Sequence, residues 1–122
     1  MGLKNKILIV DDESQIRELL QTFLIAQGYK VNTADNGGSA VDLLFNDHYD
    51  LVISDIAMPE FDGLELLKKL KENDKRVNVI MMTGYPSSET ERTAREYGAV
   101  DYLLKPLDFK ELSNTVSRLL EK

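Results

Sequence analysis

The chain contains no cysteine, only one histidine and no long apolar run among its 122 residues. Without cysteine there is no disulfide framework, no thiolate metal site and no cysteine nucleophile. No run approaches the roughly 18–20 apolar residues of a membrane-spanning helix, and the chain does not start with an apolar segment of signal-peptide length. The net charge of −6 argues against direct nucleic-acid binding, which depends on neutralising phosphates. These absences predict a cytoplasmic protein with neither a membrane nor a nucleic acid as partner.

A regular alternation of strand-like and helix-like segments runs through the whole chain. The predicted strands are Ile7–Val10, Tyr29–Ala34, Leu51–Ser54, Asn78–Thr83 and Asp101–Leu104. Amphipathic stretches between them predict helices, which implies right-handed crossovers and a parallel sheet covered on both faces. The predicted fold is α/β, a doubly wound, flavodoxin-like (βα)5 arrangement around a five-stranded parallel sheet. Residues 1–122 are expected to form a single domain that ends with the fifth helix, with no output domain in the chain.

Local signals suggest where several of these helices begin and end. Ser14 is expected to cap the first helix, and Gly28 to end it. The apolar residues recurring at helical spacing between them are Ile16, Leu19, Leu20, Phe23 and Leu24. Asn36-Gly37-Gly38 is predicted to be a turn, and Asp62-Gly63 a turn and helix cap.

Four of the apolar runs end in polar residues that a core would not select. These residues are Asp11 with Asp12, then Asp55, Thr83 and Lys105. The carboxyl ends of parallel strands lie along one edge, where open α/β sheets bind ligands. Clustered carboxylates repel one another unless a cation lies among them, and the usual oxygen-binding cation is divalent. The pattern predicts a metal site and an anion held by both the metal and a lysine.

Phosphoryl transfer is the chemistry that this combination favours. An aspartate such as Asp55 can attack phosphorus when a metal and a cation neutralise the incoming oxygens. Asp12 and Asp55 are expected to share Mg²⁺, with Asp11 acting from a second layer or through water. Lys105 is expected to pair with Asp55 before the reaction and with a phosphoryl oxygen after it. Thr83 is expected to donate to another phosphoryl oxygen, beside a close backbone approach at Gly84.

Further short motifs extend this pattern over the whole chain. They are Met58-Pro59, Asp62-Gly63, Thr83-Gly84, Gly98-Ala99 and Asp101-Tyr102-Leu103-Leu104-Lys105-Pro106. Together with Asp11-Asp12 and Asp55, and in this order, they make the chain similar to a receiver domain of a two-component response regulator. Each motif is weak alone, but the combination is highly specific.

The resemblance implies roles for individual residues. Asp55 would accept a phosphoryl group from the phosphohistidine of a sensor histidine kinase or phosphotransfer protein. Mg²⁺ (or Mn²⁺) would be bound by Asp12, Asp55 and the backbone carbonyl of Ala57, with Asp11 assisting. The Lys105-Pro106 bond would be cis.

The resemblance also implies a conformational switch. On phosphorylation Thr83 would move toward the phosphate and Tyr102 would turn inward. The surface of the fourth helix, fifth strand and fifth helix would then change and control an output domain or protein. A phosphorylation-dependent homodimer through that surface is a further expectation. Such a domain is not an enzyme, because it catalyses only its own phosphorylation and dephosphorylation.

Competing interpretations have specific weaknesses. An aspartate-nucleophile phosphohydrolase usually needs a second aspartate two residues after the nucleophile, where this chain has Ala57. A flavin-binding module of the same fold would need donors after the first strand, where the loop Asp11-Asp12-Glu13-Ser14 is anionic. Taken singly, Thr83 is a strand end and Tyr102 a packing residue, so their roles depend on the combination. A stand-alone regulator, part of a transcription factor and part of a hybrid kinase all stay open.

Overall fold

Five strands and five helices alternate along residues 5–121, the part of the chain that the computed structural model describes. Residues 1–4 and 122 of the predicted domain lie outside the described residues. The strands are β1 (Lys6–Val10), β2 (Lys30–Ala34), β3 (Leu51–Asp55), β4 (Asn78–Thr83) and β5 (Asp101–Leu104). The helices are α1 (Ser14–Ala26), α2 (Gly37–Asn46), α3 (Gly63–Glu72), α4 (Ser88–Glu96) and α5 (Phe109–Leu120).

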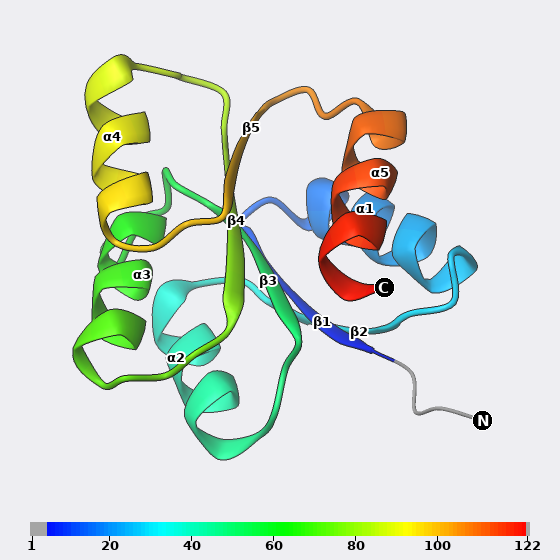
Figure 1. Ribbon diagram of the computed structural model, residues 1–122, viewed down its shortest axis with the longest axis horizontal. Helices are drawn as coiled ribbons and strands as arrows, with labels where there is room; N and C mark the ends of the chain where they lie inside the picture. Colours follow the sequence, from blue (N-terminus) through cyan, green and yellow to red (C-terminus); the bar gives the residue numbers. More distant parts are fainter. Residues whose placement is uncertain (1–4, 122) are drawn as a thin grey trace.

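The five strands form one parallel sheet in the order β2-β1-β3-β4-β5. Helices α1 and α5 cover one face, and α2, α3 and α4 cover the other (Figure 1). This confirms the predicted doubly wound α/β fold. The strand order changes direction between β1 and β3, so ligands are expected beyond the carboxyl ends of these two strands.

The core consists of two apolar layers separated by the sheet. Alternate residues of β1 serve opposite layers: Ile7 and Ile9 pack toward α1 and α5, whereas Leu8 and Val10 pack toward α2 and α3. Because both faces of the strand are buried, the strand is apolar throughout rather than alternating with polar residues. Polar side chains are therefore confined to the strand ends, which is where the candidate site lies.

Two local predictions near the starts of helices are wrong by a short distance. Ser14 is the first residue of α1 rather than its cap; Glu13 occupies the cap position without a side-chain cap hydrogen bond. The carboxylate of Asp11 instead accepts from the Glu13 amide at 2.9 Å, which turns the chain into the helix one residue earlier. The predicted turn at Asn36–Gly38 also differs, since Asn36 caps α2 and both glycines belong to the helix.

Other local predictions can be compared with the structure directly. Gly28 follows the end of α1 with a φ of 99°, as a helix-ending glycine does. Asp62 forms a capping box with Glu65 at the start of α3. Of the apolar residues at helical spacing in α1, Leu20 and Leu24 are buried, whereas Leu19 is exposed. Among the described helices, none combines the length and hydropathy needed to cross a membrane.

Candidate functional site

Three polar residues are buried at the carboxyl edge of the sheet. Asp11, directly after β1, is 0% exposed; Asp55, at the end of β3, is 4% exposed; and Thr83, at the end of β4, is 2% exposed. Burial of charged groups is costly unless partners compensate for it. Asp12 and Glu13 follow Asp11 in the same loop and are exposed. The fold thus brings together the residues that the sequence singled out from distant positions.

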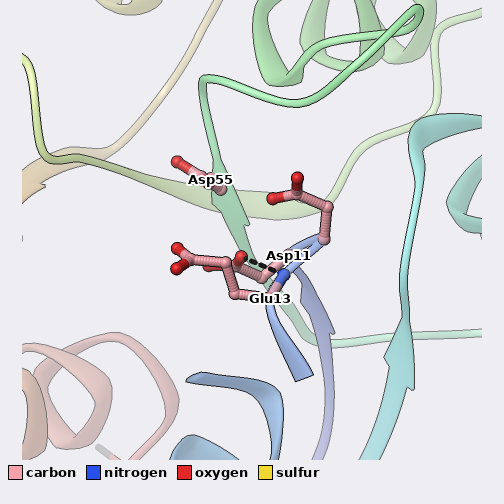
Figure 2. A group of neighbouring side chains, drawn as sticks. Asp11, Glu13 and Asp55 are labelled. Atoms are coloured by element: carbon pink, nitrogen blue, oxygen red, sulfur yellow. Dashed lines mark hydrogen bonds between the residues drawn. The ribbon is translucent and has the colours of Figure 1, made fainter. Parts of the chain in front are cut away.

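Four carboxylates converge at this edge. Asp11, Asp12, Glu13 and Asp55 each offer an oxygen within 4.8 Å of the others, and Figure 2 shows the side chains of Asp11, Glu13 and Asp55 close together. Carboxylate oxygens are the ligands that Mg²⁺ or Mn²⁺ prefers, and one or two of these four would suffice beside bound waters. The chemistry of the donors therefore fits a hard divalent cation.

Lys105, which follows β5, reaches back into this acidic group. Its Nζ lies 2.8 Å from Asp11 Oδ2, 3.1 Å from Asp55 Oδ2 and 3.3 Å from Glu13 Oε1. Burial by itself would lower the pKa of Lys105, but hydrogen bonds to Asp11 and Asp55 outweigh it and raise the pKa above its ordinary value. Lys105 is therefore a permanent ammonium among the carboxylates. The peptide bond between Lys105 and Pro106 is cis.

Asp55 is held in a defined orientation but is only partly compensated. One carboxylate oxygen accepts from the Ala57 amide at 3.3 Å, and the other pairs with Lys105. Burial raises the pKa of Asp55; the hydrogen bond to Lys105 opposes this, and repulsion from Asp11 adds to it, so that the pKa lies above its ordinary value. Further positive charge at this position would stabilise the ionised form.

Both oxygens of the Asp11 carboxylate already have a hydrogen-bond partner within the protein. Its Oδ1 accepts from the amide of Glu13 at 2.9 Å, and its Oδ2 accepts from Lys105. Each oxygen can still accept a second bond, but the two contacts fix the direction in which the Asp11 carboxylate faces. Asp12 is exposed and free of that constraint, which fits the expectation that Asp11 acts from a second layer.

A backbone hydrogen bond connects the end of β4 with the residue that follows β5, beside the acidic group. The hydroxyl of Thr83 accepts from the Tyr85 amide at 3.0 Å, and the Thr83 carbonyl accepts from the Lys105 amide at 2.8 Å. Gly84 has an ordinary φ, and a Cβ there would only touch the Lys105 side chain at 4.0 Å. The protein alone does not require glycine at this position, so its small size leaves space next to Lys105 for another group.

Tyr102 on β5 connects this edge to α4. Its side chain is half-buried, and its hydroxyl lies 2.9 Å from Thr90 Oγ1 in the first turn of α4. Neither residue belongs to the acidic group. The described structure therefore links the predicted switch residue to the helix whose surface is expected to change.

Sequence reasoning missed three contributors to the site. Glu13 contacts Lys105, and its position next to two aspartates was the available signal. Arg17 donates to the Asp11 carbonyl at 2.7 Å, which no motif indicated. Gly63 is needed because a Cβ there would lie 2.2 Å from the carbonyl oxygen of Asp55. The Asp62-Gly63 motif thus does more than begin α3: it lets α3 approach the backbone of Asp55.

Comparison with known proteins agrees with this geometry. The family model of the response regulator receiver domain matches residues 7–117. The chain belongs to the receiver domain family. Receiver domains are phosphorylation-activated signalling switches of two-component systems.

Curated relatives include both long and short proteins. The receiver domain is 44% identical over 117 residues to the regulatory protein AtoC of Escherichia coli, covering 96% of this chain and 25% of AtoC. It is 37% identical over 118 residues to sporulation initiation phosphotransferase F of Bacillus subtilis, covering 97% of this chain and 95% of that protein. The chain spans about a quarter of the first relatives found, AtoC and the Klebsiella oxytoca transcriptional regulatory protein ZraR, with 25% and 27% covered.

Solved structures show the same fold. Vibrio cholerae chemotaxis protein CheY4 is 31% identical with a TM-score of 0.90, covering 97% of this chain and 100% of CheY4. TrrA from Thermotoga maritima, solved in complex with Mg²⁺ and BeF, is 40% identical with a TM-score of 0.85, covering 95% of this chain and 99% of TrrA.

Proposed function

We propose that Asp55 is the phosphoryl acceptor of this receiver domain. The observation that carries the proposal is the contact of Lys105 with both Asp11 and Asp55 inside a group of four carboxylates. A fixed ammonium and a cation-binding carboxylate set around one buried aspartate are what in-line transfer to a weak nucleophile requires. The phosphoryl donor is a phosphohistidine of a sensor histidine kinase or phosphotransfer protein.

In this proposal Mg²⁺ (or Mn²⁺) would be bound by Asp12, Asp55 and the backbone carbonyl of Ala57. Asp11 would assist without binding the cation directly. The bound cation neutralises charge on the phosphoryl oxygens and on Asp55. The complex of Mg²⁺ and BeF with the relative TrrA supports this assignment. Asp11 would contribute by holding the Lys105 ammonium and the Glu13 amide in place through its two hydrogen bonds.

During transfer, a carboxylate oxygen of Asp55 forms the new O–P bond while the P–N bond of the phosphohistidine breaks. The imidazole nitrogen leaves with the bonding electron pair. The Lys105 ammonium moves from the Asp55 carboxylate to a phosphoryl oxygen. The Thr83 hydroxyl leaves the Tyr85 amide and donates to a different phosphoryl oxygen. No separate substrate is turned over: the domain catalyses only its own phosphorylation and the hydrolysis that reverses it.

The consequence of transfer is a change at the surface of α4, β5 and α5. Movement of Thr83 toward the phosphate leaves room for Tyr102 to turn inward, and its hydrogen bond to Thr90 must then break or carry α4 with it. This surface would control an output domain or partner protein, or form a phosphorylation-dependent homodimer. The resemblance to transcriptional regulators several times longer than this chain supports an attached output domain as one arrangement. The cytoplasmic location stays a prediction from the sequence.

A phosphohydrolase is disfavoured by Ala57. That position is exposed beside Asp55, where such an enzyme would need a carboxyl group as general acid. Alanine has no proton to give a leaving group, so release of an alcohol would lack catalysis.

The proposal is tested by intact mass spectrometry after incubation with Mg²⁺ and acetyl phosphate. The expected product carries one added phosphoryl group, which is absent without Mg²⁺ and absent in Asp55→Asn. Asp74→Asn is the matched control, because Asp74 is exposed in the loop after α3 and outside the acidic group.

Two other results would contradict the proposal. An adduct that persists in Asp55→Asn would place the acceptor elsewhere. Steady hydrolysis of acetyl phosphate without any adduct would favour a phosphohydrolase.

A further inference from the structure

Arg17 on α1 is bonded to the backbone of the acidic loop. Its Nη1 donates to the carbonyl oxygen of Asp11 at 2.7 Å. This carbonyl is the first one beyond β1. A hydrogen bond from a charged donor is stronger than a neutral one, and a guanidinium holds its donors in a fixed plane.

The contact restrains the loop because a peptide unit is planar. Holding the carbonyl of Asp11 also sets the direction of the next N–H and the position of the Asp12 Cα. The same loop is fixed twice more: the Asp11 amide donates to Ala34 at 3.1 Å, and the Glu13 amide donates to the Asp11 carboxylate at 2.9 Å. The backbone on both sides of Asp12 is therefore restrained, although the Asp12 side chain is exposed.

We infer that Arg17 is a positioning residue for the cation site, and that it acts by holding the Asp11–Glu13 backbone so that the Asp12 carboxylate faces Asp55. The inference rests on the proposed function, because it assumes that the acidic group binds Mg²⁺. A ligand held in place before binding loses less conformational freedom when the cation arrives. Its contact is with the backbone carbonyl of Asp11, so it would act through the loop.

The sign of the effect separates positioning from simple electrostatics. Arg17 carries a positive charge beside the backbone of the acidic loop, and that charge repels a divalent cation bound there. If charge were its only influence, neutral variants would bind Mg²⁺ more tightly than the wild type. Positioning predicts the opposite, namely weaker binding despite the lost repulsion.

The test is isothermal titration calorimetry with MgCl₂ on the wild type, Arg17→Met, Arg17→Gln and Arg76→Met. We expect Arg17→Met to weaken Mg²⁺ binding by about tenfold, within the range of residues that orient metal ligands. Arg17→Gln, which is neutral but keeps an amide donor, should recover part of this loss. Arg76→Met removes an exposed arginine outside the acidic group and should bind as the wild type does. Unchanged or tighter binding in Arg17→Met would overturn the inference.

Amide hydrogen exchange in metal-free protein gives a second readout. Arg17→Met should speed exchange at Asp12 and Glu13 while the amides of β3 keep their protection, which also shows that the variant is folded. Unchanged exchange at both residues would refute the positioning role. If the wild type itself binds no Mg²⁺, the proposed metal site is wrong. Hydrogen exchange still tests Arg17 in that case, because the same exchange rates in the variant and the wild type would show that Arg17 does not hold the loop.

Discussion

Two lysines at opposite edges of the sheet are equally buried but have different surroundings. Lys6, at the start of β1, is 15% exposed and pairs with Asp47, which is 54% exposed, while its ammonium lies 4.5 Å from the centre of the Tyr49 ring. Lys105, at the carboxyl edge, is 14% exposed and contacts Asp11, Asp55 and Glu13. The pKa of each lysine lies above its ordinary value, because neighbouring carboxylates stabilise the ammonium.

The difference lies in the balance of charge. At the amino edge one ammonium faces one hydrated carboxylate and an aromatic ring, which is a self-sufficient arrangement. At the carboxyl edge one ammonium faces three carboxylates, and Asp12 adds a fourth to the group. The excess negative charge is tolerable in a folded protein only at an energetic cost, and a divalent cation would remove that cost. The Lys6–Asp47 pair is therefore interpreted as structural, and the excess of carboxylates around Lys105 as a cation-binding arrangement.

Removing Lys105 should have the largest effect on this contrast. Lys105→Met leaves Asp11 buried without its cation, and loss of one partner of a buried ion pair costs several kcal/mol. Because other partners and solvent remain nearby, we expect a loss of about 3 kcal/mol in EDTA, or about 10 °C in Tm. Thermal unfolding followed by circular dichroism measures this, and Mg²⁺ should restore part of the loss. A wild-type Tm in EDTA would show that Lys105 does not compensate the cluster.

Mg²⁺ itself should stabilise the wild-type protein. At ten times its dissociation constant, a ligand bound only by the folded state adds about 1.4 kcal/mol to the free energy of unfolding, which is about 5 °C in Tm for a domain of this size. The same titration on Asp12→Asn should give a smaller shift. A shift of equal size in both proteins would place the cation outside the acidic group.

Asp55→Asn should stabilise the metal-free protein by a smaller amount. The pKa of Asp55 is raised by burial, so its ionised form destabilises the fold as the pH rises through that pKa. At neutral pH the full cost is present, and we expect Asn to recover about 1 kcal/mol, or about 4 °C. Melts in EDTA across acidic and neutral pH should show the gain shrinking as the pH falls and Asp55 becomes protonated. A gain that stays constant with pH would contradict this cause.

Lys6→Met should have the smallest effect. Its partner Asp47 is well hydrated, and exposed ion pairs contribute little. We expect a minor change in Tm that does not depend on Mg²⁺, and the same phosphorylation by acetyl phosphate as in the wild type. A Mg²⁺-dependent change would mean that the two edges of the sheet are coupled.

Most of the fold was predictable because its signals are local. Apolar runs such as Ile7–Val10 are typical of strands buried on both faces, and Asp62 begins α3 through a capping box within four residues. The errors fall where a distant or neighbouring group competes with a local preference. The Asp11 carboxylate, rather than Ser14, shapes the start of α1. Spacing alone also does not show which apolar residues of a helix are buried: Leu20 is, whereas Leu19 is exposed.

The sequence predicted that several polar residues would meet at one edge of the sheet, but it did not predict the contacts that they make there. The position of Asp11, Asp55, Thr83 and Lys105 after apolar runs placed them at one edge once the sheet was known to be parallel. The sequence pattern did not indicate which carboxylates Lys105 would contact. It also did not indicate that Arg17 bonds to the Asp11 carbonyl, or that glycine is needed at position 63 against Asp55. The residues in these contacts are separated by between 6 and 94 positions in the sequence.

The sequence by itself determined the order of strands and helices and the chemical groups available at the strand ends, because periodicity and residue type act within a few neighbours. Only the tertiary structure decided that Lys105 contacts Asp11 94 positions away and that the loop after β1 is held by a guanidinium. Distances between side chains depend on how the strands are ordered and how the helices pack, which are properties of the whole chain. The proposed phosphoryl transfer at this edge depends on those distances, since charges interact according to their separation.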